Sequence, residues 1–195
     1  MTEETEMATS DCEGGRSRVH DTAVELYQLA ALMLNDESQA AELVEATVAQ
    51  ANIDPCADAD ASVQAARLNL VETALARLSQ ADPTAFDAPL PSGEASGGCI
   101  EGDDLSSAGI SAGQLAGMVN GPERRTLRDW LEKLPVAQRA IFVERAILGW
   151  DNAAAAASLS KAVARNWQPR QVSELFRLAL CSLATSLAHS AAVKA

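Results

Sequence analysis

The sequence predicts an all-α fold made of two small helical domains. Apolar residues form 48% of the chain but aromatic residues only 4%, so the core must be built largely from Ala, Leu and Val. Such a composition favours packed helices over strands. No stretch alternates apolar and polar residues for long, whereas several stretches repeat apolar residues at three- and four-residue steps, which is the helical period.

The charge of the chain is divided unevenly along its length. The formal net charge is −12, with −11 in residues 1–79, −6 in residues 80–122 and +5 in residues 123–195. The basic C-terminal part can approach nucleic-acid phosphates even though the whole chain is acidic.

Residues 1–19 are rich in Glu, Thr, Ser and Gly and lack an apolar period, so we expect a disordered tail. Residues 20–79 predict a bundle of three amphipathic helices, over about 21–34, 39–51 and 61–79. Asp21 can cap the first helix, and Asp36 or Ser38 can cap the second.

Residues 80–122 have a different composition, with prolines, glycines and serines among acidic residues and no basic residue. This composition predicts a flexible linker between the two domains. A short helical piece near residues 110–119 is weakened by its glycines.

Residues 123–195 predict a helix-turn-helix domain. A fourth helix begins at Pro122 or Glu123, and a fifth begins at Pro135 and ends at Gly149. Asp151 can cap a sixth helix, and the last helix begins at Pro169 with an apolar stripe from Val172 onward. Two short helices, a turn and a longer helix form the arrangement that places a helix in a DNA major groove.

The C-terminal motif resembles region four of bacterial RNA polymerase sigma factors of the extracytoplasmic-function type. The resemblance is carried by Leu134-Pro135, then Gln138-Arg139-Ala140-Ile141-Phe142-Val143, then Gly149 and a capped helix. Two N-terminal strings are similar to region two of the same family: Leu34-Asn35-Asp36 and Ala40-Ala41-Glu42-Leu43-Val44-Glu45-Ala46-Thr47. Together the two regions cover most of residues 20–188.

The resemblance implies that the N-terminal domain binds core RNA polymerase and opens the promoter, while the last helix reads promoter DNA. The residues expected to face polymerase are Glu42, Leu43, Val44 and Glu45. Those expected to approach DNA from the last helix are Arg170, Gln171, Ser173, Glu174 and Arg177. Lys161 and Arg165, in the basic connection before that helix, are expected to contact phosphates.

Two departures from the family pattern keep other functions open. The third predicted helix, over 61–79, has no aromatic residue and only Arg67 and Arg77 as cations, although holding single-stranded DNA needs both kinds of residue. The turn before Pro169 is also about half a dozen residues longer than the family's. One alternative is a sigma mimic that sequesters an anti-sigma factor without touching DNA. Another is a stand-alone helix-turn-helix regulator with an unrelated dimerisation bundle.

The remaining features predict a cytoplasmic protein without enzymatic activity. The four cysteines lie far apart without zinc-ligand spacing, and we expect free thiols in a reducing cytoplasm: Cys12, Cys56, Cys99 and Cys181. No signal peptide and no apolar run of membrane length is present. The sequence has no phosphate-binding glycine loop and no nucleophile–base arrangement, so no cofactor, no metal and no catalytic residue is expected.

Trp130 and Trp150 are expected in the core, whereas Trp167 lies on no apolar stripe.

Overall fold

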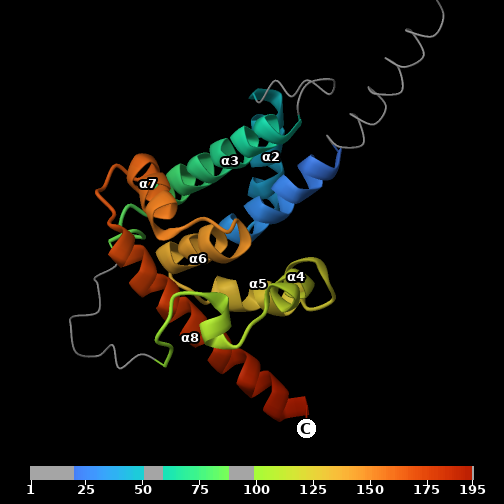
Figure 1. Ribbon diagram of the computed structural model, residues 1–195. Helices are drawn as coiled ribbons and strands as arrows, with labels where there is room; N and C mark the ends of the chain where they lie inside the picture. Colours follow the sequence, from blue (N-terminus) through green and yellow to red (C-terminus); the bar gives the residue numbers. More distant parts are fainter. Residues whose placement is uncertain (1–19, 51–58, 88–98, 195) are drawn as a thin grey trace, which may run out of the picture. The chain divides into compact units, whose positions relative to one another are not determined.

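The computed structural model describes residues 20–50, 59–87 and 99–194, and every regular element within these ranges is helical (Figure 1). The predicted all-α fold class is therefore confirmed. The chain divides into two compact units, residues 1–74 and 75–195, and the boundary falls within one long helix. The tail expected over residues 1–19 lies outside the described residues. Within the described ranges no helix combines the length and apolar character needed to cross a bilayer.

The N-terminal unit contains a helix over residues 20–34, α2 (Glu37–Gln50) and the first part of α3 (Ala59–Ala81). Asp36 caps α2, because its Oδ1 accepts from the backbone N–H of Gln39 at 2.9 Å. This bond and a second one to the Gln39 side chain lower the pKa of Asp36. Part of each predicted apolar stripe is buried, including Ala31, Leu43 and Leu70, whereas Val24, expected on the stripe of the first helix, is 44% exposed.

The described part of the C-terminal unit contains a series of further helical elements: η1 (Leu105–Ala108), α4 (Ala112–Asn120), α5 (Arg124–Glu132), α6 (Val136–Phe142), α7 (Asn152–Ala162) and α8 (Pro169–Lys194), with a π-helical turn η2 (Val143–Ile147) after α6. The long α8 packs against both α6 and α7, and η1 also contacts α8 (Figure 1). Leu175, Phe176 and Leu180 of α8 are fully or almost fully buried, which confirms its predicted apolar stripe.

The turn signals before α7 and α8 lie where the sequence predicted them. Gly149 has a φ of +69°, the left-handed conformation that glycine adopts without a steric penalty. Asp151 caps α7 by accepting from the backbone N–H of Ala154 at 2.7 Å. The connection over residues 163–168 buries Trp167, whose backbone N–H donates to the Ser160 hydroxyl at 2.9 Å. Trp130 is also buried, whereas Trp150 is half-buried.

The prediction of a flexible linker over residues 80–122 is wrong for residues 99–121. The capping box of Ser111 and Gln114 starts α4, and Leu115 and Met118 are buried. α4 packs on α5, and η1 packs on α8. The unfavourable glycines are therefore offset by capping and by burial against the C-terminal unit. The remaining part of the predicted linker includes residues 88–98, which lie outside the described ranges.

Candidate nucleic-acid interface

The N-terminal end of α8 is the candidate recognition surface. Because Val172, Leu175 and Phe176 are buried against the rest of the unit, the opposite side of this end of the helix is left for other contacts. Gln171 stays close to the helix end, where its side-chain oxygen accepts from the backbone N–H of Gln168 at 2.8 Å.

Arg170 is the most accessible of the predicted DNA-binding cations in α8. Its side chain is 88% exposed. Its Nε donates to Oε1 of Glu174 at 2.9 Å, one helical turn further on. Ion pairs of this kind at a surface contribute only about 0.3–0.5 kcal/mol, so the guanidinium can exchange Glu174 for another anion at little cost.

Arg177 does not point freely into solvent, which corrects the expectation that it is available to DNA. Its Nε and Nη2 donate to the backbone carbonyl oxygen of Ile100 at 3.1 and 2.8 Å. Ile100 belongs to residues 99–104, which contain Glu101, Asp103 and Asp104 and which we call the acidic strap.

Ser173 is also engaged by the acidic strap. Its hydroxyl is the largest influence lowering the pKa of Asp103, followed by the side chain of Asn152, whose Nδ2 donates to Asp103 Oδ2 at 2.6 Å. The guanidinium of Arg145 adds a further favourable charge, with Nη2 at 4.0 Å from Asp103 Oδ2. The Asp103 carboxylate is thus held by groups from η2, α7 and α8.

Arg145 links the strap to the helices beneath it. Its Nη1 donates to the carbonyl oxygen of Trp150 at 2.6 Å, and its Nη2 donates to the backbone carbonyl of Asp103 at 2.9 Å. Its guanidinium carbon also lies 5.0 Å from the centre of the Phe176 ring, within cation–π range. Neither Arg145 nor Asn152 was predicted as a site residue, since both lie in stretches whose periodicity indicates packing.

The cations of the connection before α8 differ in their surroundings. Arg165 forms an ion pair with Asp87, a residue from the segment that follows α3. Lys161 lies exposed in the last turn of α7. Arg165 must therefore release the Asp87 carboxylate before it can bind DNA.

The strap is fastened to α8 by a disulfide between Cys99 and Cys181. The prediction of free thiols is wrong for these two cysteines, while Cys12 and Cys56 lie outside the described residues. The two positions are 82 residues apart, so their spacing gave no signal of a bond. Folding of the strap along α8 brings their Cα atoms to 5.9 Å, a separation that suits a disulfide.

Only part of the predicted polymerase-binding set is accessible on α2. Leu43 is fully buried and Val44 is 8% exposed, so the expectation that these two residues face a partner is wrong. Their side chains lie on the apolar stripe that forms the core. Glu42 and Glu45 are exposed and remain candidates for contact with a partner.

Glu144 is a buried carboxyl that the sequence reasoning missed. It lies in the π-helical turn η2, is fully buried, and neither carboxylate oxygen has a hydrogen-bond partner within the described residues. Burial raises its pKa to about 8, against a smaller opposing influence of the nearby Ser158 hydroxyl. The sequence signal for the burial of Glu144 is its position directly after the apolar run Ile141-Phe142-Val143.

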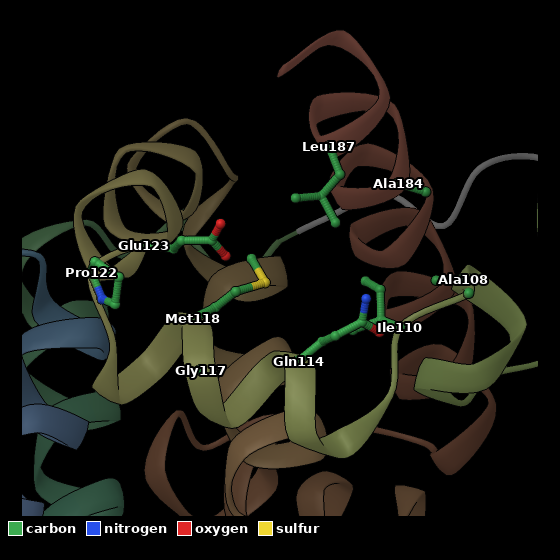
Figure 2. Close-up of a pocket in the computed structure, with 10 residues that line it drawn as sticks. Ala108, Ile110, Gln114, Gly117, Met118, Pro122, Glu123, Ala184 and Leu187 are labelled. Atoms are coloured by element: carbon green, nitrogen blue, oxygen red, sulfur yellow. The ribbon is translucent and has the colours of Figure 1, made fainter. Parts of the chain in front are cut away.

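A groove of about 660 Å³ lies elsewhere on the C-terminal unit, between α4 and the far part of α8 (Figure 2). Met118 and Leu187 point into it from opposite sides, and Glu123 is its one ionisable lining residue. Leu187 follows Arg170 by 17 residues, or about 26 Å along a helix axis. With a carboxylate and no cation in its lining, the groove offers no phosphate chemistry.

Comparisons with protein-family models, with curated proteins and with solved structures found no match to this chain.

Proposed function

We propose that this protein is a sigma-type transcription initiation factor that acts in the cytoplasm. In this proposal the N-terminal unit binds core RNA polymerase, and the C-terminal unit binds promoter DNA through α8. The protein positions polymerase and DNA and performs no chemistry of its own.

One observation carries the DNA-binding half of the proposal: Arg170 stands 88% exposed on the first turn of a helix that is entered from a capped α7 through a turn. In a helix-turn-helix, residues at this end of the second helix contact base edges. A bidentate arginine–guanine contact contributes about 1–3 kcal/mol to discrimination between bases.

The polymerase half of the proposal is supported by the exposed carboxylates Glu42 and Glu45 on α2. They lie three residues apart, so they share one face of the helix. Leu43 and Val44 support this surface from beneath, because they fix α2 in the core of its unit.

DNA binding is tested with the reduced full-length protein and a labelled duplex, by fluorescence anisotropy over a range of salt concentrations. The proposal predicts salt-dependent binding that Arg170→Ala weakens by about tenfold, since 1.4 kcal/mol corresponds to a factor of ten. Arg125→Ala is the matched control, because Arg125 is an exposed arginine on α5. Equal effects of the two substitutions would remove α8 as the recognition helix.

A second candidate function, a sigma mimic that binds an anti-sigma factor, is favoured by a different observation. Arg177 and Arg165 are both engaged by groups of the same chain rather than being free for DNA. A pull-down from the source cell that recovers an anti-sigma factor, together with no salt-sensitive DNA binding by any form of the protein, would favour the mimic.

A further inference from the structure

We infer that Arg145, Asn152 and Ser173 form a binding site for a nucleic-acid phosphate, and that the Asp103 carboxylate occupies this site in a closed state fastened by the Cys99–Cys181 disulfide. The inference rests on the proposed DNA-binding function and adds its regulation.

The groups around the Asp103 carboxylate are suited to an oxyanion. Asn152 Nδ2 donates to Oδ2 at 2.6 Å, Arg145 Nη2 lies 4.0 Å from Oδ2, and the Ser173 hydroxyl lies near enough to the carboxylate to lower its pKa. An amide, a hydroxyl and a guanidinium are the side chains that contact DNA phosphates in protein complexes. They come from η2, the first turn of α7 and the first turns of α8, so one anion can bridge all three elements.

The acidic strap runs antiparallel to α8 along one stripe of the helix. Cys99 is bonded to Cys181, the Ile100 carbonyl accepts from Arg177, and the Asp103 carboxylate lies near the Ser173 hydroxyl, which lowers its pKa. The three α8 positions follow one another at steps of four residues, which places them on one side of the helix. The strap therefore covers the side of α8 that carries two of the five predicted DNA contacts.

The negative charge of the acidic strap means that the closed state competes with anionic ligands in particular. Asp103 places a negative charge where a phosphate would make the same hydrogen bonds, and Glu101 and Asp104 add charges that repel a DNA backbone. A phosphate backbone and the strap thus compete for the same donors, and binding of one requires release of the other.

The disulfide favours the closed state over the state in which a phosphate occupies the site. While it is intact, residue 99 stays beside residue 181, and the strap competes as an intramolecular ligand at high effective concentration. A dithiol reductant transfers two electrons and two protons to the bond and becomes a cyclic disulfide, leaving Cys99 and Cys181 as thiols. Disulfides in a reducing cytoplasm are commonly transient and redox-sensing, which suits this role.

The inference is tested in the full chain with two probes, a random-sequence DNA duplex at low salt and inorganic phosphate. The variant Asp103→Asn keeps the shape of the side chain and removes its charge. Glu101→Gln is the matched control, because Glu101 is an exposed carboxylate in the same strap. Circular dichroism checks that each variant and the reduced protein remain helical.

In the DNA arm, Asp103→Asn is expected to bind the duplex about tenfold more tightly than the oxidised parent protein, and reduction of the parent is expected to tighten binding in the same direction. Glu101→Gln is expected to change affinity by less than about twofold, since an exposed charge is screened by salt. DNA binding that is equal in the oxidised protein, the reduced protein and all variants overturns the inference and leaves the proposed function standing.

In the phosphate arm, millimolar inorganic phosphate is expected to raise the Tm of Asp103→Ala more than that of Glu101→Ala or of the parent protein, because binding to the emptied site stabilises the fold. Equal shifts in all three proteins overturn the anion site. If phosphate acts selectively on Asp103→Ala but no form binds DNA, the anion site stands and the proposed DNA-binding function falls.

Discussion

The guanidinium of Arg177 donates from both Nε and Nη2 to the carbonyl oxygen of Ile100, a residue 77 positions earlier in the chain. This contact places an acidic segment along the helix that was predicted to be open to DNA. It also makes Arg177 a structural residue in the closed state.

Arg177→Ala is expected to destabilise the C-terminal unit by about 1.5–3 kcal/mol, the usual contribution of a hydrogen bond to a charged group. The part-buried carbonyl oxygen of Ile100 would lose both of these donors. Urea unfolding monitored by circular dichroism measures the change.

Arg170→Ala is the control for this substitution, because Arg170 is exposed and pairs with Glu174 at the surface. Its expected cost is below about 0.5 kcal/mol. Equal costs for the two substitutions would contradict the contact between Arg177 and the strap.

Glu144 makes stability depend on pH in a defined direction. Its pKa is raised to about 8 in the fold, whereas an unfolded carboxyl titrates near 4.5. Between these values the folded state holds a proton that the unfolded state has lost, so the free energy of unfolding decreases as pH rises through this window. The maximum slope from one group is about 1.4 kcal/mol per pH unit.

The variant Glu144→Gln is expected to remove this decline and to be more stable than the parent protein at pH 8. Urea unfolding between pH 5 and pH 8 makes the comparison. The difference between the pH profiles of the two proteins reports on Glu144, because all other titratable groups are common to both. A parent protein and variant with parallel pH profiles would show that the carboxyl is not titrating in this window.

The disulfide between Cys99 and Cys181 closes a long loop, since the two positions are 82 residues apart. Closing such a loop restricts the unfolded chain, and a bond of this kind stabilises a fold by about 2–4 kcal/mol. Reduction is therefore expected to lower the Tm, as measured by differential scanning calorimetry with and without a dithiol. The double variant Cys99→Ser, Cys181→Ser should melt like the reduced parent and no longer respond to the dithiol. A dithiol response that persists in this variant would assign the effect to other cysteines.

The charge of α2 is expected to control binding to core polymerase without affecting the fold. Glu42→Lys combined with Glu45→Lys reverses two exposed charges and should weaken association by about tenfold or more, if these carboxylates face the partner. Gln50→Lys is the control, because Gln50 is an exposed residue at the end of α2, outside the Glu42–Glu45 set. A loss of association as large in Gln50→Lys as in the double variant would mean that these two carboxylates have no particular role.

Leu43→Ala is expected to act differently, because Leu43 is fully buried. It should lower the free energy of unfolding of the N-terminal unit by about 2–5 kcal/mol. Circular dichroism at increasing urea separates this loss of folding from the loss of a contact surface.

Local signals in the sequence predicted much of the C-terminal unit. Pro169 begins α8, Asp151 caps α7 and Gly149 adopts the left-handed conformation, as expected. Each of these features depends on residues within a few positions of one another, and the apolar period of α8 identified its buried face.

The strap could not be predicted because its contacts join residues far apart in the chain. Ile100 and Arg177, Asp103 and Asn152, and the two cysteines are each separated by 49 residues or more. No periodic pattern connects such positions. The composition of residues 80–122 instead indicated a linker, because the glycines and acidic residues of residues 99–121 resemble those of flexible segments.

Buried residues on α2 and η2 show where reasoning from the sequence fell short. The family resemblance indicates that Leu43 and Val44 face a partner, whereas both side chains are buried in the core of their unit. Glu144 was not identified as a site residue, because carboxyls are ordinarily exposed and only its neighbours in three dimensions reveal its burial.

Co-purification with core RNA polymerase of the source cell tests the central claim most directly. The full-length protein, reduced and at moderate salt, is expected to elute with core polymerase as a stoichiometric complex that retains promoter DNA. The Glu42→Lys, Glu45→Lys variant is expected to elute separately. No association of the parent protein with core polymerase, at low or at moderate salt, would contradict the account.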